Sequence, residues 1–165
     1  MKQITLVRHA KSDWSFANLD DHDRPLNNRG LHDAPFMGQL MASRGWKPDV
    51  LISSTAVRAK TTAGFFLEAL GYHQDRLLLR KEIYEAPTHT ITRLIQGLDD
   101  EWQNVALFGH NPTFTLVANM FYPNDFFDNL PTCGIVQIEA PDVHTWQDFS
   151  PTTAHVTRHF FPKEF

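Results

Sequence analysis

The chain has 165 residues, of which 42% are hydrophobic and 21% are charged, and its formal net charge is −4 with a pI near 6.1. This balance fits one globular domain over residues 1–165 and argues against a nucleic-acid-binding protein, which carries clustered excess Lys and Arg. Cys133 is the only cysteine, which excludes an intramolecular disulfide and a cysteine-rich zinc site. No apolar segment is long enough to span a membrane and no signal peptide is evident, so we expect a cytoplasmic protein that does not bind membranes.

Short apolar runs alternate with helical patterns along the chain. The predicted strands cover residues 4–7, 50–53, 77–80, 104–108, 134–139 and 155–161. The predicted helices cover residues 28–43, 56–70, 88–96 and a segment that begins near Pro112. Asn27 and Thr88 are candidate N-caps, Gly71 is a candidate stop, and Pro35 is expected to kink its helix or to mark its true start.

Strands separated by helices indicate right-handed crossovers between parallel strands. We therefore expect an α/β fold, a three-layer sandwich with a mostly parallel central sheet flanked by helices. The last two strands have no helix between them and are expected to add antiparallel edge strands.

Arg8 and His9 directly follow the first predicted strand. In open α/β sheets, ligands bind beyond the carboxyl ends of the strands. A nucleophilic imidazole beside a guanidinium suits the capture of a tetrahedral oxyanion such as a phosphoryl group. A lone histidine is more often a capping or core residue, so this interpretation needs support from other segments.

Two later segments place further polar side chains at strand ends. Arg58 falls in the first turn of the helix after strand 50–53, where helix N–H groups and a guanidinium can face an anion. His110 follows Gly109, which permits a tight turn out of strand 104–108. The alternatives are a solvated helix arginine and a turn histidine held by local hydrogen bonds. If the three strands are neighbours in one sheet, these side chains converge with the first pair.

These motifs, in this order, resemble those of the histidine phosphatase superfamily. Within it the chain looks like the small SixA-type phosphohistidine phosphatases, and the resemblance spans residues 4–163. It is carried by Arg8-His9-Ala10-Lys11-Ser12-x-Trp14, Asp23-Arg24-Pro25-Leu26, Ser53-Ser54 with Arg58-Ala59, Gly109-His110-Asn111-Pro112 and Phe161-Pro162-Lys163. The resemblance implies a phosphoglycerate-mutase-like fold. The short connection 83–87 implies that it has no cap insertion.

The resemblance also implies roles for individual residues. His9 becomes the phosphohistidine intermediate, and Arg8, Arg58 and His110 bind the phosphoryl oxygens. Two guanidiniums and an imidazole stabilise the charge on these oxygens without a metal, so we expect neither a metal nor a cofactor. His9 must be unprotonated on its attacking nitrogen, and its other nitrogen is expected to donate to a backbone carbonyl.

The general acid is open at this point. Larger relatives place a Glu after the third strand, and Glu82 occupies that position, with Glu85 as its rival. The less favoured alternative for both is a solvated loop carboxylate. A phosphohistidine substrate needs less acid assistance than an ester, because imidazole leaves more easily than an alkoxide.

The run Asp20-Asp21-His22-Asp23 raises the question of a metal site. Adjacent positions cannot all point at one ion, so a solvated acidic loop is the favoured interpretation.

Together these observations predict a metal-independent phosphatase that hydrolyses protein phosphohistidine through a covalent phosphohistidine intermediate. The alternatives are a broad phosphomonoesterase on small phosphate esters and a phosphate- or phosphoprotein-binding module without turnover. The physiological substrate and the oligomeric state are not determined by the sequence.

Overall fold

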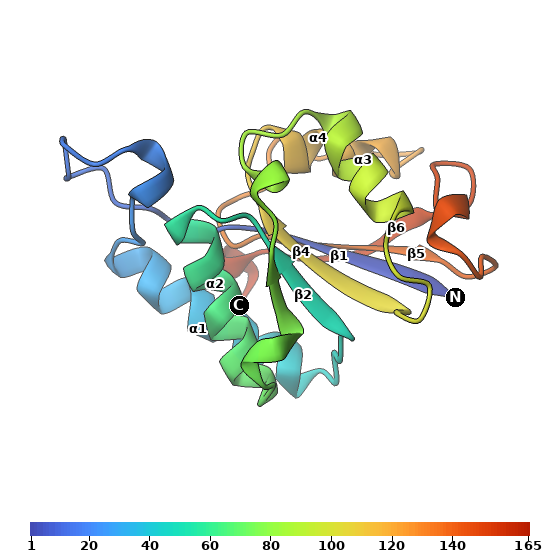
Figure 1. Cartoon of the computed structure of the whole chain (residues 1–165), viewed down its shortest axis with the longest axis horizontal. Coiled ribbons are helices and arrows are strands. Elements are labelled where there is room, and N and C mark those ends of the chain that lie inside the picture. The colour runs from blue at the N-terminus through green and yellow to red at the C-terminus, as the bar shows by residue number, and fades with distance from the viewer.

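The computed structural model describes all residues 1–165 and shows one six-stranded sheet between two pairs of helices (Figure 1). Its strands are β1 (Lys2–Arg8), β2 (Val50–Ser53), β3 (Leu77–Leu79), β4 (Asn104–Gly109), β5 (Ile135–Ala140) and β6 (His155–Phe160). They lie in the order β3-β2-β4-β1-β5-β6. The first four strands in this order are parallel, and β5 runs antiparallel to both β1 and β6.

The helices are α1 (Asn28–Ser43), α2 (Val57–Leu70), α3 (Thr88–Gln96) and α4 (Thr113–Met120). Two of the short 3-10 turns matter for the site, namely η1 (Asp21–Asp23) and η3 (Lys81–Ile83). Only residues 80–87 connect β3 to α3, so the fold carries no cap insertion. None of the helices combines the length and the apolar character that a membrane span requires.

Local capping explains where two of the helices begin and end. The Asn27 side chain accepts a hydrogen bond from Gly30 N at 2.9 Å and starts α1 as predicted. Gly71 ends α2 in the left-handed region, with φ +70°. The prediction of Thr88 as an N-cap is wrong, because Thr88 is the first helical residue and Pro87 is the N-cap. Of the two expectations for Pro35, the start of the helix is excluded, because α1 already begins at Asn28 and contains Pro35.

The central strands are buried on both faces, as parallel strands covered by helices are. On β1 and β4, Leu6 and Leu107 point into the core beneath α3 and α4, whereas Val7 and Phe108 point into the core beneath α1 and α2. Burial on both faces is why these strands read as continuous apolar runs. The mostly parallel three-layer α/β fold expected from the sequence is confirmed.

Candidate active site

A pocket of about 260 Å³ opens beyond the carboxyl ends of the central strands. Arg8 is the last residue of β1 and His9 follows it, while His110 directly follows β4. Arg58 reaches the same place from the first turn of α2. The lining residues are Arg8, His9, Lys11, Ser12, Trp14, Arg24, Arg58, His110, Asn111 and Thr132. Four of the five predicted site residues therefore line one pocket, which we call the phosphate pocket.

The His9 imidazole is oriented by a backbone carbonyl. Its Nδ1 lies 2.7 Å from the carbonyl oxygen of Ala10, and since a carbonyl only accepts, Nδ1 carries the proton. Nε2 is then the basic nitrogen with a free lone pair. His9 is only 7% exposed, and this burial lowers its pKa to about 3. The imidazole is therefore neutral at physiological pH, as a nitrogen nucleophile must be.

The backbone around His9 is held from three sides. His9 N donates to the carbonyl of Gly109 at 3.0 Å, and His9 O accepts from Cys133 N at 3.0 Å. Ala10 N donates to the hydroxyl of Thr62 in α2, also at 3.0 Å. The histidine thus sits on a rigid sheet end, which suits a group that must be placed accurately.

Two guanidiniums flank this histidine. Nη1 of Arg8 donates to the carbonyl of Leu130 at 2.7 Å, and burial lowers the pKa of Arg8. Nη1 of Arg58 donates to the carbonyl of Asp21 at 2.6 Å, and its Nη2 donates to Asp21 Oδ2 at 2.9 Å. The Nε atoms of both arginines are buried without a hydrogen-bond partner. A bound oxyanion is the kind of acceptor that such buried donors lack.

The second histidine lies beside the first. The ring centroids of His110 and His9 are 5.2 Å apart, and His110 Nε2 lies 2.8 Å from Ser54 Oγ. Burial, and after it the charge of Arg58, lowers the pKa of His110 to about 4. A Cβ on Gly109 would lie 2.4 Å from the Phe114 ring, so the glycine is required for close packing, not for an unusual turn.

Residues 4–86 match the model of the histidine phosphatase superfamily (branch 1). The chain belongs to this superfamily. It is a phosphatase of the histidine phosphatase type.

Three relatives match this chain in sequence over different lengths. An uncharacterised protein of Mycobacterium tuberculosis is 27% identical, over 95% of this chain and all of that protein. One of Mycobacterium leprae is 30% identical over 68% of each chain. An uncharacterised chloroplastic protein of Arabidopsis thaliana is 43% identical over 61 residues, but this chain covers only 28% of its length.

Two solved structures of SixA proteins share the fold. The SixA of Agrobacterium tumefaciens, itself proposed to be a phosphohistidine phosphatase, superposes with a TM-score of 0.82 at 27% identity, covering 96% of this chain and 97% of that one. The protein histidine phosphatase SixA complexed with tungstate superposes with a TM-score of 0.81 at 16% identity, covering 98% of both chains. The second likeness concerns the fold alone.

The acidic loop of this histidine phosphatase is exposed to solvent at Asp20, Asp21 and Asp23, as expected, but its Asp21 carboxylate also bonds to residues of the site. The Asp21 carboxylate accepts from Arg58, from Arg24 at 3.0 Å and from the Tyr84 hydroxyl at 2.7 Å. Partial burial opposes its ionisation, but the hydrogen bonds from Tyr84, Arg58 and Arg24 hold the pKa of this carboxyl below its usual range. No cluster of three or more His, Cys, Asp or Glu residues is placed to hold a metal ion.

Arg24 is a pocket residue that was not predicted. Its side chain is buried, and Nη1 donates to Ser12 Oγ at 2.9 Å while its Cζ lies 3.4 Å from the centroid of the Trp14 ring. The sequence signal for Arg24 is the motif Asp23-Arg24-Pro25-Leu26, which carries part of the resemblance to the SixA-type proteins but implies no role for this arginine.

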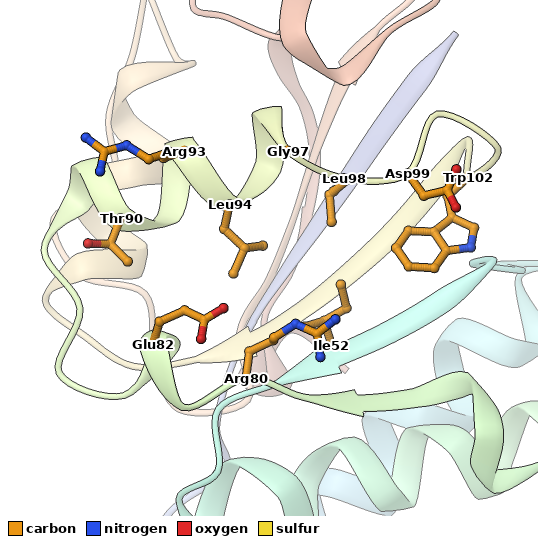
Figure 2. Close-up of a pocket in the computed structure, with 10 residues that line it drawn as sticks. All are labelled: Ile52, Arg80, Glu82, Thr90, Arg93, Leu94, Gly97, Leu98, Asp99 and Trp102. Atoms are coloured by element: carbon orange, nitrogen blue, oxygen red, sulfur yellow. The ribbon is translucent and has the colours of Figure 1, made fainter.

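Glu82, the predicted general acid, does not line the phosphate pocket. It lines a different pocket of about 500 Å³ together with Arg80 and with residues of α3 (Figure 2). The η3 turn is responsible, because Ile83 is buried close to Gly109 while its neighbour Glu82 is exposed. Glu85 is not a lining residue of either pocket. The structure thus separates the proposed acid from the other four residues.

Proposed function

We propose that this histidine phosphatase hydrolyses phosphohistidine on a protein, with His9 as the covalent nucleophile. The observation that carries the proposal is the state of His9. Its Nδ1 proton is fixed on Ala10 O, its Nε2 is unprotonated, and cationic donors surround it in the phosphate pocket.

The chemistry has two balanced steps. In the first, His9 Nε2 forms a bond to phosphorus while the bond from phosphorus to the substrate imidazole breaks, and the leaving nitrogen takes a proton from solvent. In the second, water attacks the phosphoryl group on His9, the Nε2–P bond breaks, inorganic phosphate leaves, and the proton that the attacking water loses returns to solvent. Arg8, Arg58 and His110 stabilise the equatorial oxygens in both steps.

The choice of a nitrogen leaving group follows from the composition of the pocket. Its lining holds two imidazoles, several cations and hydroxyl or amide groups, but no carboxyl group. Asp21 touches Arg58, yet its low pKa makes it a poor proton donor. An alkoxide leaving group needs a positioned acid, whereas an imidazole leaves with a proton far more easily. The pocket is therefore better suited to phosphohistidine than to an alkyl phosphate.

The size of the pocket favours a protein substrate. A cavity of about 260 Å³ has room for a phosphoryl group and a ring, and no inserted segment covers it. The SixA of Agrobacterium tumefaciens, similar at 27% identity, is itself proposed to act on phosphohistidine. A broad phosphomonoesterase is the second candidate, because bacterial phosphoglycerate mutases match part of this chain at 36–37% identity.

A phosphoenzyme assay tests the proposal. Wild-type protein exposed briefly to a radiolabelled phosphodonor should retain label that is labile in acid, and His9→Ala should retain none and lose at least 99% of turnover, since the nucleophile is essential. The assays are run in EDTA, because the proposed chemistry uses no metal. More than a few per cent of wild-type turnover in His9→Ala would contradict the role of His9. Activity that needs a divalent ion would contradict the metal-independent mechanism.

A substrate comparison separates the two candidate functions. The kcat/KM for a phosphohistidine-bearing domain should exceed that for 3-phosphoglycerate and for sugar phosphates. If a small ester is the better substrate, the protein is a broad phosphomonoesterase and the proposed phosphohistidine specificity is wrong. A protein that binds phosphate tightly but turns over none of these would be a binding module.

A further inference from the structure

Three large apolar side chains are exposed on the connection between β1 and α1. Trp14 is 72% exposed, Phe16 50% and Leu19 41%. We call residues 13–19 the apolar loop, and Figure 1 shows this blue segment extending outward from the body of the molecule. Exposure of apolar surface to water is unfavourable, and a cluster of such residues marks an interaction site.

The base of this loop is well defined. Asp13 N donates to Pro25 O at 2.8 Å, next to a β-bridge between Ser12 and Leu26. The Asp13 carboxylate accepts from Ser15 N at 2.7 Å and from Ser15 Oγ at 2.6 Å. The apolar side chains are therefore presented by a closed loop, not by a loose end.

The loop is continuous with the phosphate pocket. Trp14 lines that pocket and stacks on Arg24, which lines it as well. Arg24 is tied through Asp21 to Arg58. A molecule too large for the pocket that delivers a phosphoryl group to His9 must rest on this rim.

We propose that the apolar loop is the docking surface for the protein domain that carries the phosphohistidine. This inference rests on the proposed function. The pocket accommodates only the phosphorylated side chain, so the rest of such a domain stays outside and needs a surface to contact. Trp and Phe are enriched at the energetically important positions of protein interfaces, because they bury large areas with little loss of side-chain freedom. The cationic pocket supplies the charge complementary to the phosphoryl group, and the loop beside it supplies the apolar contact.

The test uses a variant outside the catalytic machinery. Phe16→Ser combined with Leu19→Ser removes apolar surface from residues that do not line the pocket. Phe165→Ser is the matched control, because Phe165 is 48% exposed and lies beside Arg44 at the C-terminal end of α1, a helix about 24 Å long. Each protein is assayed on a phosphohistidine-bearing domain and on phosphoimidazole, a small compound with the same reacting bond.

The double variant should lose about tenfold in kcat/KM on the domain, mainly through KM, while its kcat/KM on phosphoimidazole stays within about twofold of wild type. Phe165→Ser should match wild type on both. Equal losses on both substrates, or no loss on the domain, would overturn the docking proposal. The proposal would also fail if the double variant lost binding to phosphatidylserine vesicles, or lost dimerisation, while its kcat/KM on the domain was unchanged. If the wild-type protein is inactive on both substrates, the proposed function is wrong and the docking proposal fails with it. If the wild-type protein is active on both and the double variant has the same kcat/KM on the domain, only the docking proposal is wrong.

Discussion

His9 and His110 have centroids 5.2 Å apart, and burial lowers their pKa values to about 3 and about 4. Both imidazoles are therefore neutral in the free enzyme at neutral pH. The neutral form leaves His9 with a basic nitrogen, as the proposed nucleophile requires, while His110 still has one N–H to donate. The permanent positive charge of the site comes instead from guanidiniums, which cannot be deprotonated in this pH range.

The residue most in need of a test is Glu82. Because it lies outside the phosphate pocket, Glu82→Gln should leave phosphohistidine hydrolysis within about twofold of wild type. A positioned general acid contributes roughly 10²–10⁴-fold, and the measurement is kcat/KM on phosphohistidine and on an alkyl phosphate. Glu85→Gln is the control three positions away. A large loss confined to the alkyl phosphate in Glu82→Gln would restore Glu82 as the acid and would require η3 to move when substrate binds.

Asp21 is expected to position Arg58. Asp21→Asn keeps the shape of the side chain but removes the charge that orients both Arg58 and Arg24, so kcat/KM should fall about tenfold. Steady-state kinetics on phosphoimidazole measure the loss, and a circular dichroism melt checks the fold. Asp20→Asn is the matched control, because the Asp20 side chain forms no hydrogen bond or ion pair. Faster turnover in Asp21→Asn would mean that the carboxylate competes with phosphate for Arg58.

At the scale of elements, the start of α1 fixes one wall of the site. Asn27 N donates to Lys11 O at 3.0 Å, and Gly30 in the first turn of the helix lies directly against that same carbonyl. Lys11 in turn lines the phosphate pocket. The first turn of α1 is therefore in direct contact with the backbone of the pocket wall. A larger side chain in this turn must displace the wall and change the shape of the pocket.

Gly30→Ala tests this contact. The new Cβ would lie 2.2 Å from Lys11 O and 3.1 Å from Leu26 Cβ, so the backbone of the wall must move. We expect the free energy of unfolding to fall by about 1–3 kcal/mol, with a parallel loss of kcat/KM. Urea denaturation and phosphoimidazole kinetics measure the two effects.

Gly64→Ala is the control for Gly30→Ala. A Cβ at Gly64, inside α2, meets no atom within 4 Å, so alanine should stabilise the helix by about 0.5–1 kcal/mol with unchanged activity. If Gly30→Ala behaved like this control, the close approach of α1 to the pocket wall would not matter.

For the molecule as a whole, the sequence predicts the sheet and most of the pocket because both depend on regular patterns. Apolar runs locate the strands, and parallel strands bring the residues at their carboxyl ends together. Arg8 ends such a strand, and His9 and His110 come directly after one. Arg58 lies in the first turn of the helix that follows another strand. Their convergence needed no knowledge of loop paths.

The features that were missed depend on loop paths and long-range contacts. The Asp21–Arg58 pair joins residues 37 positions apart through a loop without periodicity. The direction of Glu82 is set by the packing of Ile83, which no local pattern reveals. Lys2 is fully buried, and its Nζ donates to the carbonyls of Asp100 and Trp102 at 2.7 and 2.8 Å, which makes this burial tolerable. The sequence around Lys2 does not indicate these distant partners.

The buried histidines also make the stability of the whole molecule depend on pH. The unfolded chain binds protons on these two side chains near pH 6.5, whereas the folded protein binds them only near pH 3 and 4. Between these values the unfolded state holds more protons, so the free energy of unfolding rises with pH and falls as pH drops below about 6.5. Each histidine changes the free energy of unfolding by at most about 1.4 kcal/mol per pH unit in this range.

Urea denaturation of wild type and of the double variant His9→Gln, His110→Gln, at pH 7.5, 6.0 and about 4.5 in phosphate-free buffer, isolates this effect. Glutamine does not titrate, so the free energy of unfolding should fall less in the variant than in wild type on acidification. The difference between these two losses should grow steadily below about pH 6.5. Asp21 acts separately, because its stabilisation is present above the unfolded carboxyl pKa near 3.9 and is lost only at more acid pH. Parallel losses in both proteins across this range would show that His9 and His110 titrate alike in the folded and unfolded states. Burial would then not be the reason that the His9 imidazole is neutral.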